Sequence, residues 1–151
     1  MAVTSFCAIT VEEGINMKRF VFFAVLLLTF ACLGAQTRER VIVLDQEFKL
    51  KIGESAKASG EGLEVEFDSV TDDSRCPKGV TCVWAGNAKV LLKVKKDTGK
   101  AADVELNTNI NPKTSRYLEY ELRLKELKPY PEINTPIKSS DYEVTLTVHE
   151  L

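Results

Sequence analysis

Leu63-Glu64-Val65-Glu66-Phe67 is the stretch of sequence that decides the fold. Apolar and acidic residues alternate in it, so on a β-strand the three apolar side chains face one way and the two glutamates face the other. The stretch therefore predicts a strand with one side in a core and the other in water.

The same alternation recurs on both sides of this strand. It is found at residues 48–52, 90–94, 104–106, 120–124 and 142–148, with weaker strand patterns at 41–44 and 55–59. Residues 97–100 form a predicted turn, with Gly99 available for a positive φ, and join 88–96 to 101–107 in a hairpin. Residues 117–128 are rich in helix-forming residues, but their period of two and their tyrosines favour a strand.

These patterns predict an all-β fold without a long helix. We expect an antiparallel β-sandwich of about seven strands with an immunoglobulin-like topology, and a small barrel is the alternative. Residues 133–140 contain a proline and are expected to form a loop, with one helical turn near Ser139.

The predicted strand at 63–70 leads into a distinctive segment. It reads Asp73-Ser74-Arg75-Cys76-Pro77-Lys78-Gly79-Val80-Thr81-Cys82-Val83-Trp84-Ala85-Gly86, and it holds the only tryptophan of the chain. The spacing of Cys76 and Cys82 suits a local structural disulfide, whose ring would include a proline and a glycine. A labile or regulatory disulfide and a metal site are the alternatives, but a metal site needs further ligands and the chain has only one histidine.

Trp84 follows Cys82 by two residues. If both lie on one strand, their side chains face the same way, and we expect the indole to pack over the disulfide in the core. An exposed aromatic platform for a ligand is the alternative. The pair Ala85-Gly86 predicts a bend or a close backbone approach.

The first part of the chain has the pattern of an export signal. Lys18-Arg19 precedes an apolar run at residues 20–33, and small residues end at Ala35. We expect residues 17–35 to be a signal peptide that is cleaved before residue 36, and residues 36–151 to be a single domain. An uncleaved anchor is the alternative, although the run is shorter than the roughly 20 residues of a membrane span.

Two further expectations concern this region. Residues 1–16 contain Glu12 and Glu13, which do not suit a signal peptide, so we expect the true start at Met17. Cys32 follows a small residue and offers a lipid-anchored protein as the alternative to simple cleavage. Export to the periplasm or beyond would favour the Cys76–Cys82 disulfide, because that environment is oxidising.

The formal net charge of −2 argues against nucleic acid as a partner, because the chain has no basic stripe. We expect a monomer that meets a membrane only through its signal or a lipid anchor.

The segment containing the cysteines resembles a family of short exported bacterial proteins. The residues that carry the resemblance are Asp73 to Pro77, Gly79-Val80, Cys82 and Trp84-Ala85-Gly86, with Gly53-Glu54, Leu106-Asn107-Thr108, Pro129-Tyr130-Pro131 and Asp141-Tyr142 outside the segment. The resemblance implies a β fold and an exported location. It assigns no catalytic residue.

The residues themselves indicate no catalytic site. His149 is near the end of a predicted strand, where a solvated surface position is expected. Asp68, Asp72 and Asp73 lack the spacing of a calcium loop. Gly60-Glu61-Gly62 is a turn without a following helix, so it predicts no phosphate site. We therefore expect no enzyme activity, no metal and no cofactor.

Two functions remain as hypotheses. The first is a non-catalytic binding or structural module of the cell envelope, whose partner is a protein or a glycan. Its candidate binding loop consists of the residues around the disulfide, Arg75, Pro77, Lys78, Gly79, Val80 and Trp84. The second is a protease inhibitor that presents Lys78-Gly79-Val80, clamped by the disulfide, to an active site.

Overall fold

The structure, a computed structural model, describes residues 40–151. The predicted start at Met17, the signal peptide and the lipid anchor at Cys32 lie outside these residues. In chain order the elements are β1 (Arg40–Ile42), β2 (Glu47–Lys51), β3 (Ser55–Ala58), β4 (Leu63–Asp73), β5 (Ala88–Lys96), β6 (Ala102–Asn107), β7 (Thr114–Tyr117), β8 (Tyr120–Lys128), η1 (Ser139–Asp141) and β9 (Glu143–Glu150).

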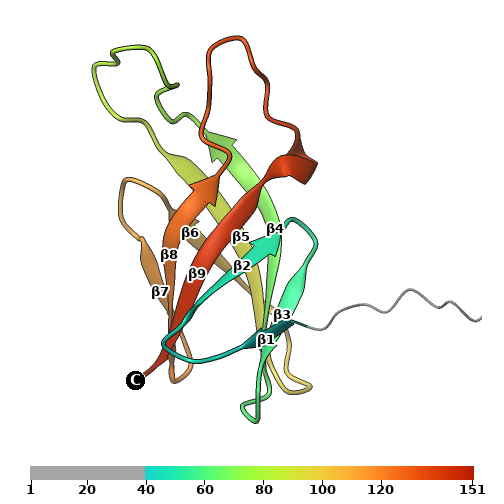
Figure 1. The fold of residues 1–151 in the computed structure, drawn as a ribbon. Helices are drawn as coiled ribbons and strands as arrows, with labels where there is room; N and C mark the ends of the chain where they lie inside the picture. The colour runs from blue at the N-terminus through green and yellow to red at the C-terminus, as the bar shows by residue number, and fades with distance from the viewer. Residues whose placement is uncertain (1–39) are drawn as a thin grey trace, which may run out of the picture. The chain divides into compact units, whose positions relative to one another are not determined.

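The strands form two sheets, which face each other in a sandwich (Figure 1). The larger sheet has the order β1-β3-β4-β5-β6, and the smaller one has the order β2-β9-β8-β7. Only the β1–β3 pair is parallel among the described strands. The predicted all-β fold with mostly antiparallel strands is confirmed, and the one helical element within residues 40–151 is the 3-10 turn η1, at the predicted place.

The strand order is that of a meander. From β3 to β6 and from β7 to β9 each strand pairs with the next one in the sequence, and β2 pairs with β9. Immunoglobulin domains instead connect their sheets by Greek-key crossovers, so an immunoglobulin-like topology is not confirmed. The described residues contain nine strands where about seven were expected. Strand β7 was missed, because the predicted strand at 117–128 is interrupted by a turn at Leu118 that joins β7 to β8.

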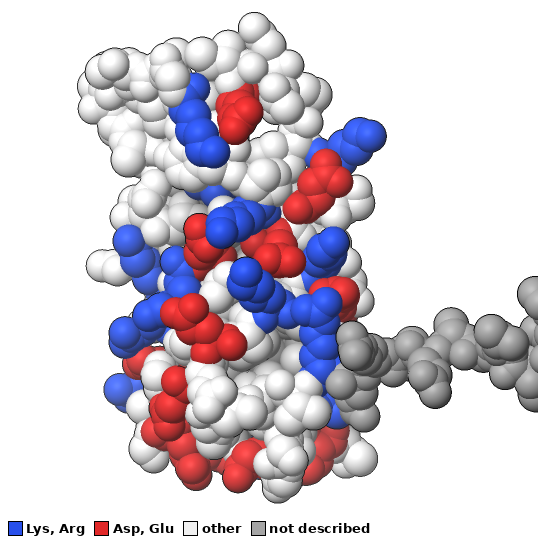
Figure 2. Space-filling view, viewed as in Figure 1, with Lys and Arg blue, Asp and Glu red and all other residues white. Residues whose placement is uncertain are grey.

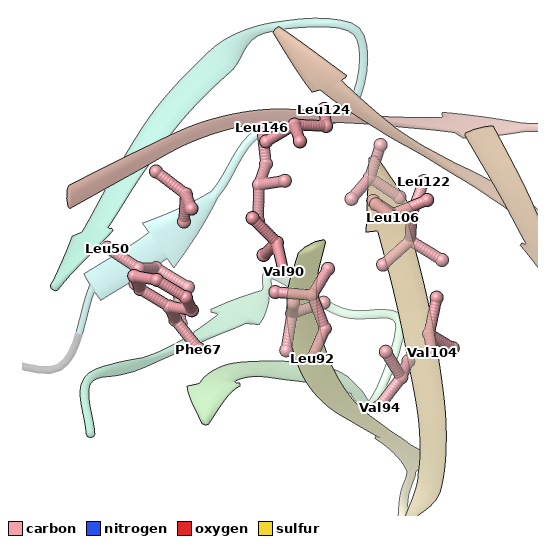
Figure 3. Close-up of a cluster of buried hydrophobic side chains, with 14 of the residues drawn as sticks. Leu50, Phe67, Val90, Leu92, Val94, Val104, Leu106, Leu122, Leu124 and Leu146 are labelled. Carbon is pink, nitrogen blue, oxygen red and sulfur yellow. The ribbon is translucent and has the colours of Figure 1, made fainter. Parts of the chain in front are cut away.

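The core contains the apolar side of the alternating strands. Leu63, Val65 and Phe67 of β4 are fully buried, as predicted for the stretch that decides the fold. Figure 3 shows side chains of both sheets meeting between the layers, among them Leu50, Phe67, Val90, Leu92, Val94, Val104, Leu106, Leu122, Leu124 and Leu146. Each such side chain contributes about 1.5–3 kcal/mol through its removal from water.

Three loops lie at one end of the sandwich, and the C-terminus lies at the other (Figure 1). They are the β4–β5 loop (residues 74–87), the β6–β7 loop (residues 108–113) and the β8–β9 loop (residues 129–142). We call them together the loop end. Within residues 40–151 no helix has the length and apolar character needed to cross a bilayer.

Candidate functional site: a braced apolar loop end

The predicted disulfide is present in the β4–β5 loop. Cys76 and Cys82 are bonded, and their Cα atoms are 6.0 Å apart. The bond closes a ring of seven residues at the loop end, on the segment that leads toward Trp84. The ring limits the conformations open to residues 77–81, because both of its ends are fixed.

The prediction that Cys82 and Trp84 share a strand is wrong. Strand β5 begins only at Ala88, and both residues lie in the β4–β5 loop. Trp84 is 59% exposed and lies outside the core cluster, so the indole is not the core residue that we expected. Its position matches the alternative of an exposed aromatic side chain.

The backbone around Gly86 explains why Trp84 is outside the core. The chain returns beside the residues that follow β4, since the amide of Cys76 donates to the carbonyl of Ala85 over 2.9 Å. Gly86 has a φ of +72°, and a Cβ atom there would lie 1.9 Å from the carbonyl oxygen of Ser74. The close approach predicted at Ala85-Gly86 is therefore present. The positive φ of Gly86 interrupts the extended backbone, so the alternation of β5 does not continue back to Trp84.

Arg75 lies beneath the loop surface and braces it. Its side chain is 3% exposed and binds Asp73 with Nε and Nη2, at 2.8 and 2.6 Å. Nη1 donates to the carbonyl of Leu127 over 2.7 Å, and Nη2 donates to that of Pro129 over 2.8 Å. The guanidinium also lies 5.2 Å from the centre of the Tyr130 ring. Arg75, which the sequence placed in the binding loop, instead joins the β4–β5 loop to the β8–β9 loop.

Tyr142 completes this buried network. Its hydroxyl donates to Oδ2 of Asp73 over 2.9 Å. Burial raises the pKa of Tyr142, and its hydrogen bond to Asp73 adds to the effect, so the pKa lies at about 12. Burial would also raise the pKa of Asp73, but the hydrogen bonds from Arg75 and Tyr142 outweigh it and hold that pKa below its usual range. Asp73 is thus a stable anion that fixes Arg75.

Asn87 attaches the third loop. Its Nδ2 donates to Oδ1 of Asn107 over 2.7 Å, and its Oδ1 accepts from the amide of Asn109 over 3.0 Å. Nδ2 of Asn109 donates in turn to the carbonyl of Gly86 over 2.6 Å. Asn87 and Asn107 are both buried, where unmade hydrogen bonds are costly. These bonds therefore hold the β6–β7 loop to the β4–β5 loop.

The other residues of the predicted binding loop lie above the buried Arg75 side chain, toward the surface of the loop end. The amide of Lys78 donates to the carbonyl of Pro131 over 2.9 Å, and its Nζ lies 3.3 Å from Oε1 of Glu132. Pro77 is half-buried, and a Cβ at Gly79 would contact Ile133 at 3.8 Å. Val80 is exposed. The structure thus brings the disulfide ring and the β8–β9 loop together.

Most of the exposed large apolar side chains gather at this end. Ten such side chains are exposed among residues 40–151, and six of them belong to the three loops. We call these six the apolar tip: Val80, Val83, Trp84, Ile110, Tyr130 and Ile133. Single exposed apolar residues are normal, but a cluster of them indicates an interaction surface. Figure 2 shows this end largely without charge, whereas acidic residues gather at the opposite end.

Four members of the apolar tip were missed in the sequence. Val83 lies between Cys82 and Trp84, which we expected on one strand of the core. Ile110, Tyr130 and Ile133 are single apolar residues in loops rich in Pro and Asn. An apolar residue within a polar loop is a weak signal, because it gives no information about neighbours from other loops. Only the folded chain brings these residues together.

A groove of about 900 Å³ lies beneath the tip, bordered by residues such as Thr108, Leu127, Tyr130 and Asp141. Charged residues of both signs line it, including Lys51, Lys128, Glu126 and Glu143. Lys128 and Glu126 pair with each other at 3.1 Å. The groove is therefore not lined by charges of a single sign, as a site that selects an ion would be.

The other candidate residues are engaged in separate pairs. Nδ1 of His149 lies 2.5 Å from Oδ1 of the exposed Asp45. Asp68 pairs with Lys93 on the outer face of the large sheet, and Asp73 pairs with Arg75. In the part of the chain that the structure describes, no group of three His, Cys, Asp or Glu residues is placed to hold a metal ion.

The resemblance to a family of short exported proteins stays a prediction. Comparison of the chain with models of protein families, with curated proteins and with solved structures finds no match.

Proposed function

We propose that this protein is a non-catalytic binding module of the cell envelope and that the apolar tip is its binding surface. The observation that carries the proposal is the concentration of six exposed apolar side chains on three loops that buried bonds hold together. Exposing these side chains to water is unfavourable, and a ligand that covers them would remove that cost.

The contacts that hold the three loops together below the apolar tip support a binding role. The disulfide, the Arg75–Asp73 pair and the Asn87 bonds fix the three loops relative to one another. A surface that is ordered before binding loses less conformational entropy when it binds. In immunoglobulin-like domains, ligands also bind loops at one end of a sandwich. The strand order here differs, so the likeness that we propose concerns only this use of the sandwich end.

The proposed location rests on two observations. The sequence before residue 36 has the pattern of an export signal, and the disulfide suits an oxidising compartment. The intact mass of the exported protein tests this. A chain that begins at Gln36 supports cleavage, and a diacylglyceryl group on Cys32 would identify a lipoprotein. Retention of residues 17–35 would contradict both.

The binding surface is tested by capture from the native envelope. Immobilised protein should retain envelope components, and the double substitution Val83→Ser, Trp84→Ser should release them. Leu118→Ser is the matched control, because Leu118 is 63% exposed and lies in the turn at the opposite end. Equal retention by the wild type and the double variant would exclude the apolar tip as the binding surface.

Protease inhibition remains a second hypothesis, based on the disulfide ring around Lys78-Gly79-Val80. The contacts of Lys78 argue for ranking it lower. An inhibitory loop offers its backbone to the protease, but the amide of Lys78 already donates to Pro131. A panel of proteases incubated with the protein distinguishes the two functions, since only an inhibitor slows substrate cleavage at stoichiometric amounts.

A further inference from the structure

The next step rests on the proposed function and names the ligand of the apolar tip. We propose that the tip docks on the surface of a lipid bilayer, with Val83 and Trp84 in the interfacial layer and the sheets standing away from the membrane. The chemistry of the side chains, the shape of the end and the distribution of charge each support this occupant.

The side chains are of the kinds that prefer a membrane interface. Trp84 and Tyr130 combine an apolar ring with one polar group, and such rings are enriched at the level of the lipid headgroups. Val83 is completely exposed, and Val80 and Ile133 are about half exposed. Aliphatic side chains beside an indole gain by entering the boundary between headgroups and acyl chains.

The shape of the end favours a soft partner. Five of the six apolar side chains come from the β4–β5 and β8–β9 loops, which project beyond the ends of the strands, and Ile110 comes from the β6–β7 loop beside them (Figure 1). Projecting side chains on a protein partner need matching pockets, whereas a bilayer adapts to them. Hydrogen bonds fix the three loops relative to one another, so the apolar side chains keep their arrangement when they meet a surface.

Charge would orient the molecule on an anionic surface. The exposed charged residues of the three loops are the basic Lys78, Lys113 and Lys138 and the acidic Glu132 and Asp141, since Arg75 is buried and paired with Asp73. Within residues 40–151 neither Lys113 nor Lys138 is in an ion pair, so both are available to lipid phosphates. The turns at the opposite end carry the acidic residues Asp45, Glu61, Asp97 and Glu119 and one basic residue, Lys100, so an anionic surface would repel that end (Figure 2).

The same charges limit the depth of insertion. The Lys78–Glu132 pair and Asp141 lie on the loops that carry the tip, and charged groups are costly in the hydrocarbon layer. In residues 40–151 no helix can span a bilayer. The tip is therefore expected to bind reversibly at the surface, with only its apolar side chains inserted.

Trp84 reports directly on this contact, because it is the only tryptophan of the chain. The test uses exported protein with Cys32→Ser, so that no lipid chain contributes, and vesicles of phosphatidylethanolamine and phosphatidylglycerol. Adding vesicles should shift the emission of Trp84 to shorter wavelength, and the protein should sediment with them. Vesicles of phosphatidylcholine alone should bind more weakly, because they lack the anionic headgroup.

Variants separate the apolar from the electrostatic contribution. Val83→Ser keeps the Trp84 reporter and should weaken vesicle binding about tenfold, the effect of losing most of one buried side chain. Lys113→Gln with Lys138→Gln should weaken binding to the anionic vesicles roughly thirtyfold at low salt and leave binding to phosphatidylcholine unchanged. Leu118→Ser should bind like the parent protein.

The outcomes distinguish this inference from the proposed function. An unshifted Trp84 emission at saturating vesicle concentration would overturn membrane docking. In that case the capture experiment decides about the tip. If the double variant Val83→Ser, Trp84→Ser fails to capture an envelope protein or glycan that the parent retains, the tip is a binding surface with a different ligand. If vesicles leave the Trp84 emission unshifted and the double variant also captures the same envelope components as the parent, both proposals fail. Equal vesicle binding by Val83→Ser and the parent would also overturn the inference.

Discussion

Arg75 shows how one residue can be understood only through partners that are distant in sequence. A basic residue in a loop next to a cysteine suggests an exposed ligand contact, so we expected Arg75 in the binding loop. The carbonyls that it binds belong to Leu127 and Pro129, more than 50 positions away. The disulfide was predictable because both of its partners lie within one short segment.

The first prediction concerns the guanidinium of Arg75. Arg75→Lys should lower the free energy of unfolding by roughly 2–4 kcal/mol, because an ammonium cannot bind Asp73 with two atoms and also reach both carbonyls. Urea unfolding measures the change. Lys78→Arg in the same loop is the matched control and should have little effect, because Lys78 is exposed. Similar stability of Arg75→Lys and the parent would show that the brace is not needed.

The second prediction concerns acid. The pKa of Asp73 is lower in the folded protein than in the unfolded chain, so ionised Asp73 stabilises the fold above the unfolded pKa of about 4. This contribution is lost as the pH falls from about 4 through the folded pKa, by at most about 1.4 kcal/mol per pH unit for one carboxylate. Urea unfolding at pH 6 and pH 3 measures the loss.

Asp73→Asn provides the comparison for the acid experiment. It should be less stable at pH 6, because Arg75 stays buried without its counter-charge. Its stability should then change less between pH 6 and pH 3 than that of the parent. A pH dependence identical to the parent's would assign the acid sensitivity to other carboxylates, such as Asp68.

At the scale of elements, alternation was a reliable guide wherever one face of a strand is buried. Strands β4, β5 and β8 follow it and lie where it predicted them, and β9 lies where predicted although Thr145 and Thr147 on its polar side are buried too. It failed at β7, because Thr114–Tyr117 has no fully buried side chain and therefore no apolar pattern. In the β5–β6 turn the residue with positive φ is Asp97 rather than the expected Gly99.

The third prediction belongs to the β4–β5 loop. Replacing Cys76 and Cys82 together by serine should lower the free energy of unfolding by about 2 kcal/mol, the loop-closure entropy of a ring this small. The domain should still fold, because the core lies between the sheets and includes neither cysteine. Thermal unfolding measures the loss of stability, and the far-ultraviolet circular dichroism spectrum shows whether the β structure is retained. A variant without β structure would show that the disulfide is required for folding.

At the scale of the whole molecule, the pairing of β2 with β9 is the contact that closes the structure. Five residue pairs join these strands, from Glu47 with Thr147 to Lys51 with Glu143. Strand β9 lies between β2 and β8, and Val144, Leu146 and Val148 are fully buried. The sequence identified β9 as a strand, but its position inside the sheet depends on pairing between distant segments, which no local pattern encodes.

The fourth prediction follows from the position of β9. A chain that ends at Tyr142 should fail to fold, because β2 and β8 lose their shared neighbour and the core loses three buried side chains. Removing only the exposed Leu151 is the control and should have little effect on stability. Circular dichroism and resistance to proteolysis measure the difference. A stable β structure in the shortened chain would contradict the prediction.

Because β9 follows every other described strand in the sequence, synthesis reaches the middle of the small sheet only after its neighbours β2 and β8. Until then β2 has no partner for its backbone and the apolar side of β8 is only partly covered. The small sheet, with β9 between β2 and β8, is therefore complete only when residues 143–150 are available for pairing.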